Sequence, residues 1–354
     1  MAIHRPCGTF DYSYYQSKAI LRTRLQWGLL LAFIAFLYSF YFWANEYILS
    51  LLIVICSFVI GMLGLQIITG YAGQISIGHA AFLGVGMYTV GCAEAHLGLN
   101  YWWTVPLAGL VAAVVGGVFG STAAKLKELY LAFATLAAHF IIVYVISNWR
   151  SMTRGTDGIW ITRPTPILGL DFGTEAGYYL WALTACVLMT YFATNLSRSK
   201  LGRAFVAVRD NDIAANVMGI NIVYTKMVAF AIGSFFAGIA GAVLSGYYAY
   251  VNIEWFTLDD SIWFLGFLVV GGFGSIFGAI SGAVLWKLLD ELVASRLSEM
   301  LSGVLGTEAF YVSAAFSLIL YALIIIVFLV FEPRGIAHRW QIIKASYRLW
   351  PFSY

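Results

Sequence analysis

Long runs of apolar residues recur along this chain from Gln26 to Phe331, and they limit what it can fold into more than any other feature. A run of about 18 or more apolar residues can cross the hydrocarbon core of a bilayer as one helix. Of the 354 residues, 61% are hydrophobic and 10% are charged, whereas about 25% of residues in soluble domains are charged. The sequence therefore predicts an all-α polytopic membrane protein with roughly 8–10 transmembrane helices. The runs are predicted at residues 26–44, 47–68, 80–97, 102–124, 129–147, 178–196, 226–250 and 310–331, with an interrupted region at 262–289.

Positively charged residues divide the chain into membrane and non-membrane parts. They concentrate in an N-terminal arm (1–25), in a polar segment (197–225) and in a tail (332–354), which flank and interrupt a transmembrane domain at 26–331. Because Lys and Arg accumulate in cytoplasmic loops, all three regions are predicted to be cytoplasmic. An even number of crossings must then separate them. The interrupted region at 262–289 is therefore predicted to return to the side where it begins.

A glycine-rich segment at residues 68–80, ITGYAGQISIGHA, interrupts the apolar pattern without adding charge. Non-helical backbone at membrane depth survives only where it is buried in protein or lines water, so we expect this segment to line a passage. Residues 271–276 repeat its GxxGxI pattern, and glycine-broken segments in two pseudo-repeated halves indicate a passage between them. The alternative is close helix packing through small residues. The predicted pathway residues are Gly70, Gly73, Gln74, Ser76, Gly78, His79, Gly271, Gly272, Gly274 and Ser275.

The sequence contains few of the residue patterns that are typical of enzymes. It contains no GxxxxGK[ST] phosphate loop, no HExxH and no dense cluster of His, Cys and carboxylate residues, so we predict no catalytic residue, metal or cofactor. His79, His96 and His139 fall in separate runs, where we expect them to be hydrogen-bonded within the helix bundle. The runs hold hardly any carboxylate that could relay protons. Energy for transport must then come from another protein, or the chain is a passive channel.

The polar segment contains an amphipathic stretch at residues 202–219. Arg209 and Asp212 are three residues apart and can pair on one helix face. A helix that binds lipid headgroups would carry more Lys and fewer acidic residues, so docking in a groove of a partner protein is favoured. The predicted coupling residues are Arg203, Arg209, Asp210, Asp212, Ala214, Ala215 and Gly219.

Three motifs, at residues 70–82, 201–215 and 270–278, resemble the permease subunits of branched-chain amino acid ABC importers, in particular the LivM type. They occur in the family's order, within a resemblance that covers residues 47–331. The resemblance implies a multi-pass subunit of a bacterial inner membrane with both termini cytoplasmic. It also implies an amino acid substrate and no nucleic acid. Its implied partners are a second, related permease, two cytosolic ATP-binding subunits and a periplasmic solute-binding protein.

The same resemblance implies that the 197–225 segment holds the coupling helix, which sits in a groove of the ATPase. This segment loosely matches the importer pattern EAAxxxG through Ala214, Ala215 and Gly219, with Ile213 in place of the glutamate. His139 and Phe140 stand where the family often has Gly and Glu, and the turn at 154–158 also departs from the family. The solute therefore stays open, since relatives also carry urea, short amides, and aromatic or other carboxylates. The rival classes are an ATP-independent channel or secondary carrier and, with less support, an intramembrane enzyme.

Overall fold

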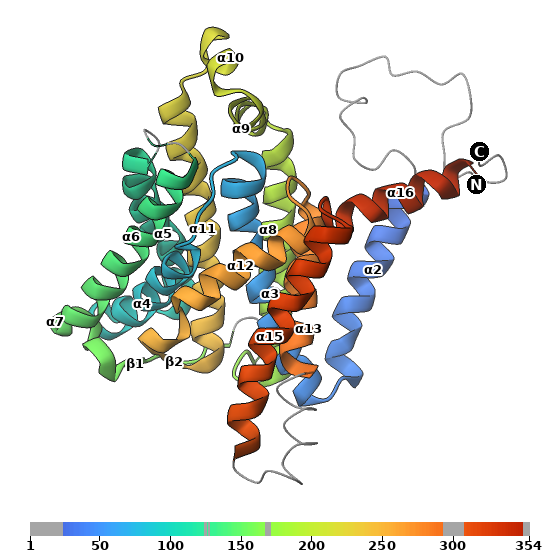
Figure 1. The fold of residues 1–354 in the computed structure, drawn as a ribbon. Coiled ribbons are helices and arrows are strands. Elements are labelled where there is room, and N and C mark those ends of the chain that lie inside the picture. The colour runs from blue at the N-terminus through green and yellow to red at the C-terminus, as the bar shows by residue number, and fades with distance from the viewer. Residues whose placement is uncertain (1–23, 124–125, 127, 167–170, 293–307, 350–354) are drawn as a thin grey trace.

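A computed structural model describes residues 24–123, 126, 128–166, 171–292 and 308–349 of the chain (Figure 1). The predicted N-terminal arm, except for residues 24 and 25, and the last five residues of the tail lie outside the described residues. The helices are α2 (Arg24–Trp43), α3 (Glu46–Leu65), α4 (His79–Leu97), α5 (Tyr101–Ala123), α6 (Glu128–Asn148), α7 (Arg150–Thr153), α8 (Glu175–Arg198), α9 (Lys200–Asp210), α10 (Asp212–Val217), α11 (Ile222–Tyr248), α12 (Leu258–Gly271), α13 (Ile276–Glu291), α15 (Glu308–Phe331) and α16 (Gly335–Leu349). Shorter elements are the π-helix η1 (Gln66–Tyr71), the 3₁₀-helices η2 (Gly155–Asp157) and η3 (Ile253–Trp255), and the antiparallel strands β1 (Ile159–Trp160) and β2 (Tyr250–Val251).

The prediction of an all-α polytopic membrane protein is confirmed. Within the described residues, six helices are long and apolar enough to cross a membrane, or up to seven if the bent pair α15–α16 is one span. The predicted number of roughly 8–10 also included α4, α12 and α13. With 14 and 16 residues, α12 and α13 are short for a bilayer, and glycines, Glu94 and His96 dilute the apolar character of α4.

Helix α11 is at the centre of the bundle, where it packs against α5, α4 and α3 (Figure 1). Small residues allow this packing, because backbones meet at the contacts. A Cβ atom on Gly238 would lie 2.6 Å from the carbonyl oxygen of Ala108, and one on Gly241 would lie 2.1 Å from that of Leu83. Close approach through small residues is how membrane helices gain dispersion contacts and association energy in lipid.

Two adjacent glycines of α5 offer a direct test of this packing. A Cβ on Gly116 would lie 2.4 Å from Ser234 Cβ in α11, whereas one on Gly117 would meet only Ala231 Cβ at 3.6 Å. We expect Gly116→Ala to destabilise the folded chain by about 1–3 kcal/mol through overpacking. Gly117→Ala should be neutral or slightly stabilising, because alanine favours a helix more than glycine. Thermal unfolding of the two detergent-solubilised variants measures the difference, and equal melting temperatures would contradict this packing.

The bundle has two distinct ends (Figure 1). The start of α2, the α9–α10 pair and the start of α16 lie toward one end, and α7 with the β1–β2 pair lies toward the other. The α12–α13 region begins after β2, and its last residue, Glu291, accepts a hydrogen bond from Tyr47 at the start of α3. Helix α3 begins at the end where β1 and β2 lie (Figure 1), so this region returns to the end where it begins. Which end faces the cytoplasm stays a prediction.

Candidate functional site

The first glycine segment breaks the helix where the sequence predicts. Helix α3 ends at Leu65, η1 widens the next turn, and residues 72–78 form no regular helix before α4 begins at His79. Gly73 has φ +69°, a left-handed conformation that a residue with a Cβ adopts only at a cost. A short irregular stretch therefore connects α3 and η1 to α4.

Side chains alternate between two faces along this irregular stretch. Gln74 and Ser76 are buried inside the chain, whereas Gly73 and Ile75 are exposed, Ile75 by 43%. The amide nitrogen and oxygen of Gln74 and the hydroxyl of Ser76 have no hydrogen-bond partner within the described part of the chain. Unpartnered buried polar atoms are costly, so these two residues are poorly explained by packing alone.

The end of this segment is fixed by polar contacts. His79 Nε2 donates a hydrogen bond to the carbonyl oxygen of Gly61 at 2.8 Å, and the buried Nδ1 has no partner among the described residues. The backbone nitrogen of Ile77 donates to Thr135 Oγ1 at 3.0 Å, and that of Ala80 donates to Ser261 Oγ at 3.0 Å. Helices α3, α6 and α12 thus fix the beginning of α4. Gly78 allows α6 to approach closely, because a Cβ there would lie 2.3 Å from the carbonyl oxygen of Thr135.

The second glycine segment separates α12 from α13. Gly272 and Gly274 have φ of +114° and +74°, and the Ser275 hydroxyl caps α13 by accepting a hydrogen bond from the nitrogen of Gly278. Gly271 packs tightly, because a Cβ there would lie 2.0 Å from the carbonyl oxygen of Gly278. The turn therefore favours glycine at 272 and 274 because of the backbone conformation, and at 271 because of the close packing.

The structure brings the two glycine segments together. Gln66 Nε2 donates a hydrogen bond to the carbonyl oxygen of Ser275 at 2.9 Å and lies 3.4 Å from that of Gly272. A Cβ on Gly70 would lie 2.8 Å from the backbone nitrogen of Gly274. The repeated GxxGxI pattern therefore marks two segments in contact. Gln66 was missed from the sequence, although a glutamine within an apolar run was the signal that could have identified it.

The predicted coupling segment is two short helices rather than one. Asn211 is extended (φ −159°, ψ 106°) and caps α10 by accepting a hydrogen bond from the nitrogen of Ala214 at 2.9 Å. This break places Asp212 in the first turn of α10. Arg209 forms an ion pair with the neighbouring Asp210 at 2.9 Å. The expectation of one continuous helix was wrong because a capping asparagine competes well with helix propagation.

The other predicted coupling residues lie around this break. Arg203 is exposed, and its guanidinium donates to the carbonyl oxygen of Arg198 at 3.1 Å. Ala214 is exposed, Ala215 is buried, and Gly219 (φ +85°) has open space around it. Ile213, Val217 and Met218 expose 69%, 82% and 82% of their surface. An apolar tip therefore projects from the end of the molecule at α10 (Figure 1).

Arg209 connects the coupling segment to both glycine segments. Its Nη1 donates a hydrogen bond to the carbonyl oxygen of Gly70 at 2.8 Å. A Cβ on Gly73 would lie 2.6 Å from Arg209 Cγ, and one on Gly274 would lie 3.2 Å from Nη1. We call this contact the Arg209 junction, and it comprises Gln66, Gly70, Gly73, Arg209, Gly272, Gly274 and Ser275. The sequence does not predict it, because its members are far apart along the chain.

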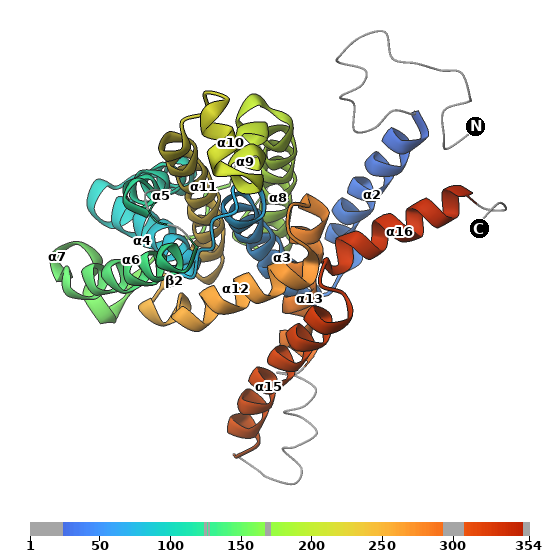
Figure 2. The ribbon, with the colours of Figure 1, turned by 45° about the horizontal axis from the view of Figure 1, so that its top comes forward.

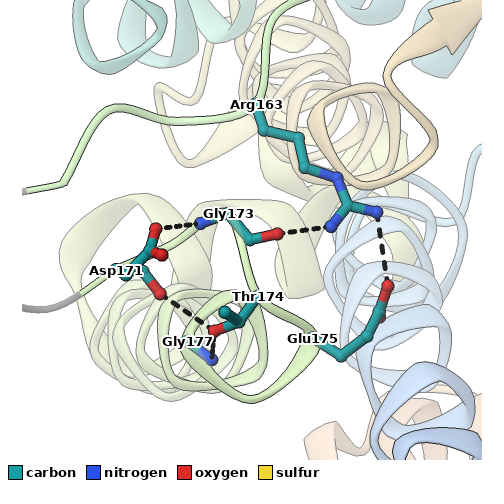
Figure 3. Close-up of polar contacts among 6 residues, drawn as sticks. All are labelled: Arg163, Asp171, Gly173, Thr174, Glu175 and Gly177. Carbon is teal, nitrogen blue, oxygen red and sulfur yellow. Dashed lines mark hydrogen bonds and ion pairs between the residues drawn. The ribbon is translucent and has the colours of Figure 1, made fainter.

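At the opposite end of the bundle, an arginine holds the loop before α8 (Figure 3). Arg163 donates to the carbonyl oxygen of Gly173 and lies 3.3 Å from Glu175 Oε1. Thr174 caps α8 through Gly177, and Asp171 accepts a hydrogen bond from the nitrogen of Gly173 at 2.8 Å. The loop is thus fixed by its own polar contacts, and none of its residues reaches the Arg209 junction.

The histidines do not form a metal site in the part of the chain that the structure describes, where no group of three or more His, Cys, Asp or Glu residues could hold an ion. His96 Nε2 donates to the carbonyl oxygen of Met152 at 2.9 Å. It lines an apolar cavity of about 490 Å³ between α4, α5 and α6, which contains no predicted pathway or coupling residue.

Comparison with known proteins shows which family of proteins this chain is similar to. The family model described as branched-chain amino acid transport system / permease component matches residues 47–329. The chain is 32% identical over 260 residues to the high-affinity branched-chain amino acid transport system permease protein LivM of Salmonella typhimurium and to that of Escherichia coli, matching 67% of this chain and 61% of each relative. It is 23% identical over 310 residues to LivH of Escherichia coli, matching 80% of this chain and 91% of LivH. No solved structure matches.

Proposed function

This chain belongs to the family of branched-chain amino acid transport permease components, and we propose that it forms half of the membrane pathway of an ATP-driven importer for branched-chain or related amino acids. Its relatives are transport permeases and not enzymes. Similarity to both LivM and LivH supports a partner that is a second, related permease. Two ATP-binding subunits and a periplasmic solute-binding protein would complete the importer.

The Arg209 junction is the observation that carries this proposal. An importer permease must convert movement at its cytoplasmic face into opening of a path between its two halves. Arg209 lies on α9 and contacts Gly70 and Gly73 of one glycine segment and Gly274 of the other. A shift of α9 would therefore act on both segments at once, through a charge-assisted hydrogen bond and through packing.

The surface beside the junction fits a protein that moves α9. Ile213, Val217 and Met218 expose apolar surface at the tip of α10, and an amphipathic helix with such a face docks in a hydrophobic groove. We propose that the ATPase provides this groove. The α9–α10 end of the bundle, together with the beginnings of α2 and α16 (Figure 1), would then face the cytoplasm.

The glycine segments are suited to act as hinges. Their positive-φ glycines allow backbone rotation, and their exposed residues, including Ile75 and Phe273, would face the second permease. Gln74, Ser76 and His79 hold polar atoms without partners in the described residues. When the segments part, these atoms would meet water or solute, so we retain them as proposed pathway residues.

Reconstitution tests the proposal. The purified complex in proteoliposomes should take up labelled leucine only with ATP on the α9–α10 side and with the solute-binding protein on the other. Competition with urea, a short amide and an aromatic carboxylate separates the alternative solutes. Uptake without ATP or ATPase would favour a channel or secondary carrier and would contradict the importer assignment.

A charge on the α10 tip should release the ATPase. We expect Val217→Glu to reduce co-purification of the ATP-binding subunits roughly 10-fold or more, since a carboxylate would lose its water on entering an apolar groove. Trp160→Glu, on a residue that is 74% exposed at the opposite end, is the matched control and should leave it unchanged. Equal recovery of ATPase with both variants would show that α10 is not the docking surface.

A further inference from the structure

The last described helix, α16, leaves the bundle. It follows α15 after a 46° bend, and both views show it projecting away from the other helices beyond its first turns (Figures 1 and 2). Residues 339–346 are all exposed. A 15-residue helix that packs on the bundle through its first turns alone is only marginally stable in water, so a surface that covers the rest of α16 is expected.

One face of α16 is apolar. Ile336, Trp340 and Ile343 are four and three residues apart and therefore share one side of the helix. Trp340 and Ile343 are 53% and 58% exposed. Tryptophan is enriched where membrane proteins meet the lipid–water boundary. This stripe fits the boundary between acyl chains and headgroups.

The charges beside this stripe all have one sign. Helix α16 contains Arg339 and Lys344 but no acidic residue, and Arg334 lies just before it, also exposed. Glu332, the acidic residue nearest to α16, already pairs with Arg339 and has a side chain only 15% exposed. The α9–α10 pair differs, because it carries Asp210 and Asp212 among its basic residues. A cationic amphipathic helix without acids complements anionic lipid headgroups.

The beginning of α16 is seated on the second glycine segment. A Cβ on Gly335 would lie 2.7 Å from the Cα of Gly272, and one on Gly272 would lie 2.9 Å from the carbonyl oxygen of Arg334. Trp340 stacks on Phe277 of α13, with ring centroids 5.8 Å apart. A force on α16 would therefore reach Gly272, which belongs to the Arg209 junction.

We propose that α16 is an interfacial helix that binds anionic lipid headgroups, and that this contact positions the glycine turn between α12 and α13. Helix α15 has 24 residues and Glu308 is its one charged residue, so it is long enough to cross a bilayer without α16, which would place α16 at the level of the headgroups. The positive charge selects anionic lipids over neutral ones, and the apolar stripe enters the acyl region. This inference does not depend on the ATPase assignment.

The test uses the full chain in nanodiscs of phosphatidylcholine, with or without phosphatidylglycerol, and measures amide hydrogen exchange. Wild-type amides of residues 335–349 should exchange roughly 10-fold more slowly when phosphatidylglycerol is present, and residues 271–275 should show smaller protection. Arg339→Gln/Lys344→Gln should lose most of this difference, and Lys344→Glu should reduce it without touching the Arg339–Glu332 pair. High salt should also reduce the difference in amide exchange between the two lipid compositions.

Arg150→Gln/Arg154→Gln, at the other end of the bundle, is the matched control and should behave as wild type. The proposal is overturned if wild-type α16 exchanges equally in both lipids, or if Arg339→Gln/Lys344→Gln keeps the full difference. Protection of α16 that arises only when partner subunits are added would identify a protein surface instead, and would also overturn it. Protection of α16 without any change at residues 271–275 would refute the positioning of the turn.

Discussion

Arg209→Met is expected to abolish most ATP-driven uptake while leaving the chain folded and assembled. Methionine keeps much of the apolar stem that packs on Gly73 but loses the hydrogen bond from Nη1 to the carbonyl oxygen of Gly70. A hydrogen bond to a charged group contributes about 1.5–3 kcal/mol, which corresponds to roughly 10- to 100-fold in rate if coupling depends on it. The measurement is leucine uptake and ATP hydrolysis by the same proteoliposomes.

Two further variants make the Arg209 experiment specific. Lys200→Met removes a positive charge from the exposed first residue of the same helix, which is not one of the predicted coupling residues, so uptake should stay near the wild-type level. Arg209→Lys keeps the charge but not the planar fork, and partial uptake is expected. If Arg209→Met hydrolyses ATP and transports as wild type does, the junction does not transmit movement.

Gly73→Ala is expected to be nearly as damaging to transport. Its new Cβ would overlap the stem of Arg209, with Cγ at 2.6 Å and Cα at 3.2 Å, and φ is +69°. Left-handed backbone costs a residue with a Cβ about 1–2 kcal/mol. The overlap with Arg209 adds roughly 1–3 kcal/mol and displaces α9. Leucine uptake should fall about 10-fold or more, consistent with that added free energy.

Gly98 is the matched control for Gly73. It also has a left-handed backbone, with φ +60°, but no atom lies within 4 Å of a Cβ placed there. Gly98→Ala should therefore carry the backbone strain without the contact, and should lower thermal stability while preserving uptake. If Gly73→Ala and Gly98→Ala transported leucine equally well, the contact between Gly73 and Arg209 would not be needed for transport.

Hydrophobic periodicity predicts most of this fold because the bilayer imposes few choices. The apolar run at 102–124 corresponds to α5 (Tyr101–Ala123), and the run at 80–97 corresponds to α4 (His79–Leu97). Backbone groups in hydrocarbon must be satisfied within the helix, so apolar length alone determines these elements. The glycines at 70 and 73 predict the break after α3, because glycine readily leaves the helical conformation.

The sequence could not predict which segments meet. Arg209 is 139 residues from Gly70, and its contact depends on how α9 packs against α8, α11 and η1. Asn211 illustrates a second limit, because local capping ended a helix that charge spacing would have continued. Gln74 and Ser76 illustrate a third, since a polar residue in a broken segment gives no indication of which side it faces.

The composition of the native complex tests the central claim most directly. The chain, tagged and solubilised mildly from its native membrane, would be recovered and its co-purifying proteins identified and counted by mass spectrometry. The importer account predicts one second permease and two ATP-binding subunits for each copy of this chain. A chain that is recovered alone or as a self-oligomer, and that still moves solute after reconstitution, would contradict it.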